Sequence, residues 1–237
     1  MPSRRALNLI AAGAAGIAMS LSSILPPGAV AEGVEVDLAL ILAIDCSFSV
    51  DQREFALQMQ GLGLAFRREE VKRAIAQGSR GRIAVTAVQW SDDQNQAVVL
   101  PWTVVSGGTE SDALGQHLAN LPRQLAEGGT SIAAALTFSA ALFEGAPAAE
   151  RRVVDVSTDG RNNSGPRVAP VRDALMAQGI TINALTILNE WPTLNIYAEN
   201  NVIGGAGSFA MPANDYEAYG EAIFRKLLRE ITGPGIS

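Results

Sequence analysis

Residues 34–50 of the chain read VEVDLALILAIDCSFSV, and this stretch decides the fold. The part from Val36 to Ile44 is an apolar run without the polar alternation that a half-exposed strand shows. Such a run is typical of a strand that is buried on both faces, in the middle of a parallel sheet with helices above and below. The sequence therefore predicts a domain organised around this strand.

The turn after the strand carries one carboxylate and two hydroxyls, from Asp45, Ser47 and Ser49. In open α/β sheets ligands bind at the carboxyl ends of the strands, which is where this turn lies. The three residues alternate along the chain, so their oxygens can point the same way from an extended loop. Hard oxygen ligands suit Mg2+ or a similar cation better than zinc, which favours nitrogen and sulfur.

Extended and helical patterns alternate along the rest of the chain, which predicts an α/β fold with a mostly parallel sheet. The first helix is expected after Val50, with Ser49 and Gln52 as its capping box. Strands at 82–90 and 97–105 are joined by a short polar turn, so we expect an antiparallel hairpin, because a parallel return needs a long crossover. Further strands are expected at residues 152–157, 180–188 and 208–211, and further helices at residues 69–77, 111–121, 131–143, 170–178, 194–201 and 215–231.

The first 31 residues have the pattern of a secretory signal peptide. Arg4 and Arg5 precede an apolar region, a proline-proline-glycine break and the cleavage-type sequence Ala29-Val30-Ala31. The alternative is a membrane anchor, but the early break and the cleavage site favour removal. Cleavage would leave one domain of residues 32–237, in the periplasm or outside the cell. We expect export by the general secretory route, with the twin-arginine route as the alternative.

Charge and cysteine content limit the function classes. The sequence holds 18 basic and 24 acidic residues, so loss of Arg4 and Arg5 with the leader would leave a net charge of −8. Nucleic acid is therefore not expected as a partner, because phosphate binding needs a basic footprint. Cys46 is the only cysteine, so no internal disulfide can form. Because Cys46 lies between Asp45 and Ser47, its side chain is expected to point away from the metal-facing side, into the core.

Two further turns offer oxygen ligands, at Thr130 and at Asp159, and a doubly wound sheet would bring such turns to one edge. The segments Asp45-Cys46-Ser47-Phe48-Ser49, Gly129-Thr130-Ser131 and Thr158-Asp159-Gly160 together resemble a known site. It is the metal-ion-dependent adhesion site (MIDAS) of von Willebrand factor A (vWA) domains, written D-x-S-x-S, then a threonine, then an aspartate usually followed by glycine. The resemblance covers the chain from about Val36 to about Ile231. Other segments are similar to an exported bacterial branch of this family that has no assigned biochemical role.

The resemblance implies a three-layer, Rossmann-like vWA fold with one antiparallel edge strand and helices on both faces. It also implies an Mg2+ or Mn2+ ion held by the hydroxyls of Ser47, Ser49 and Thr130, with Asp45 and Asp159 binding directly or through water. Two carboxylates and three neutral hydroxyls would leave the cation able to accept a carboxylate from outside. The implied function is a metal-dependent, adhesion-type module that binds a protein through an Asp or Glu carboxylate. Each residue alone could serve an ordinary turn, but the agreement of all five favours the metal site.

Two other functions stay open at this point. An Mg2+-dependent hydrolase could use the metal to activate water, but it needs a general base, and the sequence places no His, Glu or Lys beside the metal turns. The single histidine, His117, falls on a predicted helix away from these turns, and no nucleophile elbow, P-loop or cysteine-histidine pair is present. We therefore expect no catalytic residues. The domain could also be the binding subunit of a larger envelope assembly.

Three polar residues near the third turn have no obvious role. Asp155 falls in the middle of a predicted central strand, where a buried carboxylate must find partners, so we expect a structural role. Asn162 and Asn163 follow the Asp-Gly turn. Such asparagines usually support the turn itself, and contact with a partner is the alternative.

Overall fold

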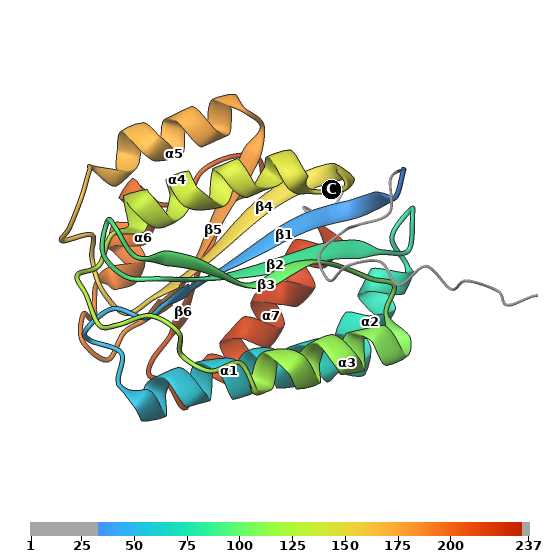
Figure 1. Cartoon of the computed structure of the whole chain (residues 1–237), viewed down its shortest axis with the longest axis horizontal. Coiled ribbons are helices and arrows are strands. Elements are labelled where there is room, and N and C mark those ends of the chain that lie inside the picture. The colour runs from blue at the N-terminus through green and yellow to red at the C-terminus, as the bar shows by residue number, and fades with distance from the viewer. Residues whose placement is uncertain (1–32, 234–237) are drawn as a thin grey trace, which may run out of the picture.

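The predicted central strand, β1 (Glu35–Asp45), lies in the middle of a six-stranded sheet in the computed structural model, which describes residues 33–233 (Figure 1). The strand order is β3-β2-β1-β4-β5-β6, and only β3 is antiparallel to its neighbour. The other strands are β2 (Ile83–Trp90), β3 (Gln96–Val105), β4 (Ala148–Thr158), β5 (Ile180–Ile187) and β6 (Ala210–Ala213). The predicted mostly parallel sheet with one antiparallel edge strand is confirmed.

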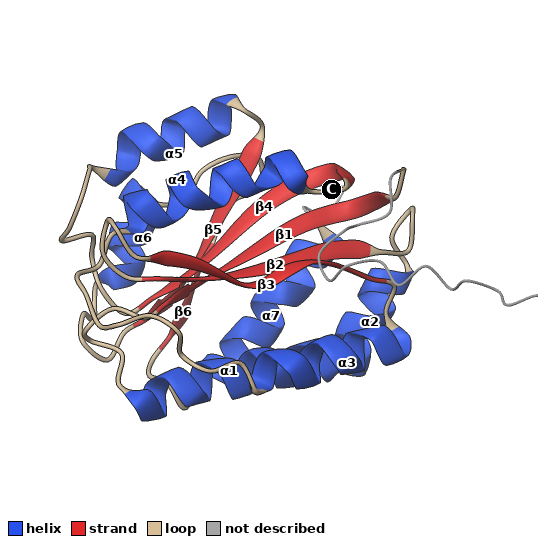
Figure 2. Cartoon of the chain, in the orientation of Figure 1, coloured by secondary structure: helices blue, strands red, loops and turns tan. Residues whose placement is uncertain are grey.

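Helices cover both faces of the sheet, as Figure 2 shows. One layer contains α1 (Gln52–Arg67), α2 (Glu69–Ala76), α3 (Gly108–Ala119) and α7 (Tyr219–Thr232). The other contains α4 (Ile132–Leu142), α5 (Val168–Ala177) and α6 (Leu194–Asn201), with a short 3-10 helix at Phe143–Gly145. No helix within residues 33–233 is both long and apolar enough to cross a membrane. The predicted signal peptide lies outside the described residues.

The side chains of β1 fill two separate cores. Leu40 and Leu42 belong to the apolar cluster beneath α1, α3 and α7, whereas Ile41 and Ala43 belong to the cluster beneath α4, α5 and α6. Successive residues of a strand point to opposite faces, so an uninterrupted apolar run satisfies both cores at once. This double burial fixes β1 as the centre of the domain.

The start of α1 differs from the prediction. Its capping box is formed by Asp51 and Glu54, not by Ser49 and Gln52: the Glu54 amide donates to Asp51 Oδ1 and the Asp51 amide donates to Glu54 Oε2. The expected Ser49 cap is wrong because the Ser49 hydroxyl donates to Asp159 instead. The helix therefore begins at Gln52, three residues after Ser49, which leaves the Ser49 side chain free to take part in the candidate site.

Both edges of the sheet carry a proline. Pro101 lies in β3 and Pro212 in the four-residue strand β6, and both are exposed. The pairing of β3 with β2 is also irregular, with register shifts on either side of the Ala87–Leu100 pair. These features shorten and interrupt the hydrogen-bonding edges of the sheet.

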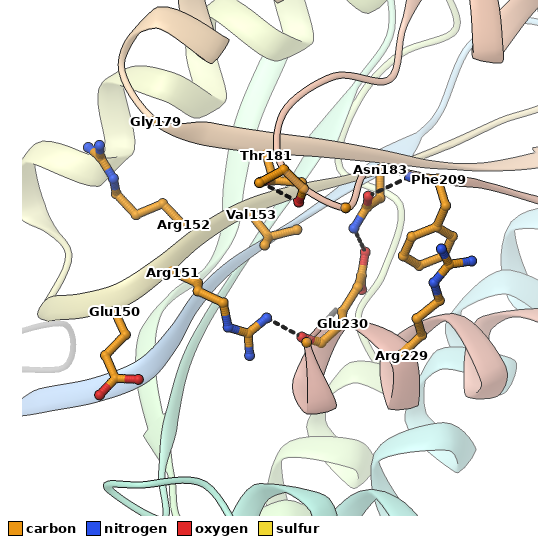
Figure 3. Close-up of a pocket in the computed structure, with 13 residues that line it drawn as sticks. Glu150, Arg151, Arg152, Val153, Gly179, Thr181, Asn183, Phe209, Arg229 and Glu230 are labelled. Atoms are coloured by element: carbon orange, nitrogen blue, oxygen red, sulfur yellow. Dashed lines mark hydrogen bonds between the residues drawn. The ribbon is translucent and has the colours of Figure 1, made fainter. Parts of the chain in front are cut away.

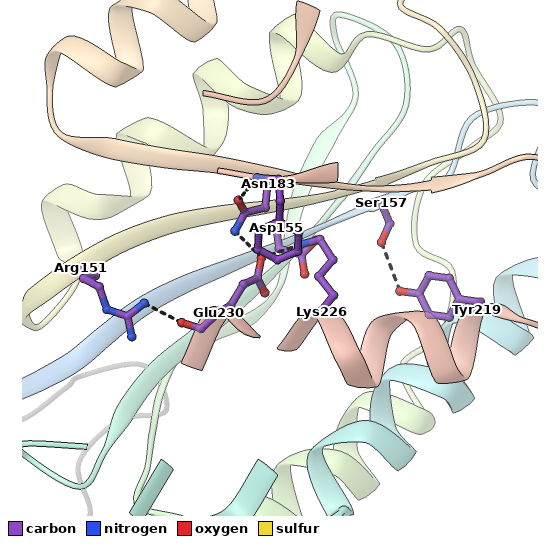
Figure 4. A network of polar contacts seen from close by, with 8 residues as sticks. Arg151, Asp155, Ser157, Asn183, Tyr219, Lys226 and Glu230 are labelled. Carbon is purple, nitrogen blue, oxygen red and sulfur yellow. Dashed lines mark hydrogen bonds and ion pairs between the residues drawn. The ribbon is translucent and has the colours of Figure 1, made fainter. Parts of the chain in front are cut away.

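A buried polar network joins α7 to β4 and β5 (Figure 4). Lys226 Nζ lies 2.6 Å from Asp155 Oδ1 and 2.6 Å from Glu230 Oε1, and the Lys226 side chain is fully buried. Asn183 Nδ2 donates to Glu230 Oε1 over 2.8 Å, and the Phe209 amide donates to Asn183 Oδ1. Asp155 thus has the structural role that we expected, and its partner is a lysine far along the chain.

Replacement of Lys226 should destabilise the fold. Lys226→Met removes the cation that Asp155 and Glu230 share, and loss of one partner from a buried ion pair typically costs about 3–5 kcal/mol. Urea unfolding at neutral pH measures this cost. Arg225→Met is the matched control, because the exposed Arg225 pairs with Glu221 at the surface and such pairs contribute about 0–1 kcal/mol. Equal effects of the two substitutions would contradict a shared buried charge.

The same network predicts a pH dependence of stability. Burial, with a contribution from Asp155, raises the pKa of Glu230 from 4.5 to about 7. The protonated carboxyl therefore contributes stability that is fully present below pH 4.5 and is lost as the pH rises through 7. Glu230→Gln resembles the protonated form, so its unfolding free energy relative to wild type should increase from pH 5 to pH 8. A constant difference across that range would show that Glu230 does not titrate there.

Candidate metal centre

The pairing of β1 with β4 brings the first and third predicted turns together. Ile44 pairs with Ser157, so Asp45 at the end of β1 lies beside Thr158 at the end of β4. Thr158 Oγ1 donates to Asp45 Oδ2 over 2.6 Å, and the Ser47 amide donates to Asp45 Oδ1 over 2.7 Å. Both oxygens of the buried Asp45 carboxylate are thus oriented by its neighbours.

Ser49 links the first turn to Asp159. Its hydroxyl donates to Asp159 Oδ1 over 2.7 Å and lies 3.3 Å from the hydroxyl of Ser47. The other oxygen, Asp159 Oδ2, accepts a hydrogen bond of 2.9 Å from Tyr216. Burial raises the pKa of Tyr216, so the phenol stays protonated as a donor. Tyr216 was not predicted from the sequence, because a tyrosine in the loop before α7 belongs to no motif.

Thr130 reaches the site from the second turn, just before α4. A β-carbon on Gly160 would lie 3.3 Å from Thr130 Oγ1, so the glycine after Asp159 allows the two turns to approach closely. Thr130 and Ser49 line the same cavity. The structure therefore brings all five predicted residues to one edge of the sheet, four through hydrogen bonds and Thr130 through this shared cavity.

Asn162 and Asn163 connect the second and third turns. The Thr130 amide donates to Asn163 Oδ1 over 2.8 Å, and the Asn163 amide donates back to the Thr130 carbonyl over 2.9 Å. Asn162 Oδ1 accepts from the Ala133 amide in the first turn of α4. These asparagines support the turns, as expected for residues after an Asp-Gly pair.

Arg123 holds the first turn from below. Its guanidinium donates to the Val50 and Cys46 carbonyls, over 2.6 Å each. The Phe48 amide also donates to the Gly128 carbonyl. These bonds fix the backbone of the turn that carries Ser47 and Ser49. No sequence pattern indicates this role, because Arg123 is a single charged residue in a predicted loop.

The electrostatics of the site suit a divalent cation. Asp45 and Asp159 are 1% and 0% exposed, and neither forms an ion pair within residues 33–233. Burial and the charge of Asp159 raise the pKa of Asp45 to about 7, and burial raises the pKa of Asp159 as well. A cation beside them would favour the charged forms of both. No group of three His, Cys, Asp or Glu side chains forms a metal cluster in the described part of the chain, so a metal here would rely on hydroxyls.

The cavity above these residues has a volume of about 410 Å3. Besides Ser49 and Thr130 it is lined by Phe48, which is 76% exposed, and by Glu190 from the loop between β5 and α6. The expectation that no glutamate lies beside the metal turns is therefore wrong. Glu190 was not predicted from the sequence, because its loop follows a strand whose end carries no recognisable motif.

A second cavity, of about 520 Å3, lies at the opposite edge of the sheet, where β4 and β5 begin (Figure 3). Its basic side chains are engaged within the fold. Arg151 donates to the carbonyls of Glu230 and Ile231 at the end of α7, and the Arg229 guanidinium lies 3.8 Å from the centre of the Phe209 ring. The side chains that line this cavity therefore hold the end of α7 against the sheet, and none of them is a predicted site residue.

Comparison with solved structures shows a vWA fold. A vWA protein from Catenulispora acidiphila matches with a TM-score of 0.58 and 19% identity over 84% of this chain and 43% of that chain. Proximal thread matrix protein 1 from the mussel byssus, with a zinc-occupied MIDAS motif, matches with a TM-score of 0.61 and 17% identity over 84% and 48%. The pilus adhesin SpaC from Lactobacillus rhamnosus GG matches with a TM-score of 0.59 and 13% identity over 85% and 30%. The chain thus spans less than half the length of each of these proteins.

Within this fold class the chain belongs to the family described as "Protein of unknown function (DUF1194)", whose profile matches residues 35–235. No curated protein matches the sequence.

Cys46 should be inert in the native protein. Its side chain is fully buried among apolar residues such as Val50 and Phe55, which confirms the expected orientation, and burial raises the pKa of its thiol to about 12. Thiolate is the reactive form, so a thiol reagent should label native Cys46 slowly and unfolded Cys46 fast. Cys46→Ala should remain folded. Rapid labelling under native conditions would show that the turn opens readily.

Proposed function

We propose that this protein is an exported, metal-dependent protein-binding module that captures a carboxylate of its partner at an Mg2+ or Mn2+ ion. The observation that carries the proposal is the joined set of Asp45, Ser47, Ser49 and Asp159, with Thr130 lining the same cavity. Two buried carboxylates without a cation partner in residues 33–233 would be stabilised by a bound divalent ion. Their hydroxyl neighbours supply the oxygen donors that such an ion prefers.

Oxygen donors alone favour Mg2+ or Mn2+ over softer metals. The similar byssus protein was solved with zinc in its MIDAS motif, so zinc is the competing ion to test. In the bound state Ser47, Ser49 and Thr130 would bind through hydroxyls, and Asp45 and Asp159 would bind directly or through water. The metal would supply Lewis acidity toward an incoming carboxylate, and the chain would supply its orientation.

The surface around the cavity suits a protein partner. Phe48 is 76% exposed and Trp191, next to Glu190, is 49% exposed. Arg161 lies over the Trp191 ring at 5.1 Å from its centre, which fixes this aromatic residue at the rim. Exposed aromatic side chains are costly in water and are enriched at protein interfaces. The similar pilus adhesin supports an adhesion-type role, and we propose the same class of role for this domain.

Export would bring the domain and its partner together in the periplasm or outside the cell. We propose that residues 1–31 are the signal peptide and that the mature domain consists of residues 32–237. Binding as a subunit of a larger envelope assembly is compatible with the same site and the same chemistry.

Metal binding should depend on Asp159. Titration of the purified protein with Mg2+ or Mn2+ in a calorimeter should show one site in wild type and none in Asp159→Ala, because half of the buried carboxylate charge is lost. Asp173→Ala on α5, an exposed aspartate that pairs with Arg172, is the control and should bind as wild type does. Equal binding by Asp159→Ala and wild type would refute the site.

Binding of the partner should depend on the bound metal ion. A pull-down from envelope extract should retain a partner in Mg2+, lose it in EDTA, and fail with Asp159→Ala. A partner retained equally in EDTA would show that another surface is responsible.

Because Glu190 lies in the cavity, a base for metal-assisted hydrolysis does exist, and a panel of phosphoesters tests this second function. Metal-dependent turnover without capture would replace the binding proposal with the hydrolase.

A further inference from the structure

Glu190 is an exposed residue beside the proposed metal site. It lines the cavity of about 410 Å3 together with Ser49 and Thr130, two of the five proposed metal ligands. A water molecule takes up about 30 Å3, so the cavity can hold a second carboxylate besides Glu190. Glu190 and these two proposed ligands therefore face one shared space.

The loop that carries Glu190 is held in place on both sides. Before it, the Leu188 amide donates to the Ala213 carbonyl of β6 over 2.9 Å. After it, the Leu194 amide donates to the Trp191 carbonyl over 3.0 Å, and Arg161 donates to Thr193 Oγ1 over 2.9 Å. These bonds hold the two ends of the loop, and the exposed side chain of Glu190 can change the position of its carboxylate by rotation about its own bonds.

No basic side chain pairs with the Glu190 carboxylate within residues 33–233. It forms no ion pair there, and its side chain makes no hydrogen bond to another described residue. The nearby Arg161 is turned to the rings of Trp191 and Tyr197 and to Thr193 instead. Glu190 thus brings a free carboxylate to the mouth of the site.

The Glu190 carboxylate changes the charge balance of the proposed metal site. Two ionised carboxylates, Asp45 and Asp159, equal the charge of one divalent cation. Glu190 then adds a negative charge that repels any carboxylate arriving from outside, unless Glu190 moves away or itself binds the metal. Hydroxyl-rich sites leave a cation free to accept such a ligand.

We propose that Glu190 is a resident ligand of the metal: it binds the ion directly in the free protein, and the partner carboxylate must displace it. This inference rests on the proposed function, because it needs a metal at the five predicted residues. Its consequence is a self-capped site, in which metal affinity and partner affinity respond to Glu190 in opposite directions.

The test counts water ligands on Mn2+ bound to the purified protein, by water-proton relaxation, in wild type, Glu190→Gln and Glu190→Asp. Loss of a direct ligand should add about one water in both variants and weaken Mn2+ binding on the order of tenfold. Acetate, as the probe carboxylate, should bind both loaded variants more tightly than it binds loaded wild type. Glu199→Gln, an equal charge change at an exposed position of α6, should match wild type.

Glu190→Asp separates coordination from simple repulsion, because it keeps the charge but shortens the side chain. If Glu190→Asp behaves like wild type, Glu190 is not a ligand. The same conclusion follows if Glu190→Gln gains no water ligand on Mn2+ while Asp159→Ala loses the metal. In either case the metal site itself still stands. If wild type binds no Mn2+, the proposed function fails first. Metal-dependent phosphoester turnover that disappears in Glu190→Gln would make Glu190 a base and would also overturn the proposal.

Discussion

The parallel pairing of β1 with β4 is the constraint on which the site depends. It joins segments that lie 113 residues apart at the hydrogen bond between Thr158 and Asp45. A slip of one residue would turn the side chains of β1 to the opposite faces and would exchange two apolar cores. Because both faces of β1 are buried, core packing holds the register, and the register in turn places the carboxylates of Asp45 and Asp159 at one edge.

Strand β4 connects two buried acidic centres of different character. At its middle, Asp155 shares Lys226 with Glu230, so the fold supplies the positive charge itself. Just after its end, Asp159 lies near Asp45. The described residues give these two carboxylates hydroxyl and phenol donors but no positively charged side chain. Hydrogen bonds orient those carboxylates without neutralising them. The second centre is therefore suited to an external cation, whereas the first already has a lysine from within the fold.

The sequence was sufficient for the fold because its strongest pattern, the apolar run of β1, follows from burial on both faces. The candidate site was also predictable, since D-x-S-x-S, Thr130 and Asp159 fall at the ends of strands or the starts of helices. Single residues were not predictable in this way. Arg123, Tyr216 and Glu190 reach the site from loops, and only the three-dimensional path of the backbone brings them there. The capping box failed for a related reason, because Ser49 has a long-range partner in Asp159 that local spacing does not reveal.

The prolines at the two sheet edges bear on how this domain can assemble with other proteins. Pro101 in β3 and Pro212 in β6 lack the amide hydrogen that an added strand would need, and β6 is only four residues long. Recognition by strand addition, in which a peptide extends a sheet, is therefore disfavoured at either edge. Contacts through loops and side chains are then favoured, and the loops at the carboxyl ends of the strands carry the exposed aromatic residues Phe48 and Trp191. The architecture thus favours association at one end of the domain over pairing along the edges of the sheet.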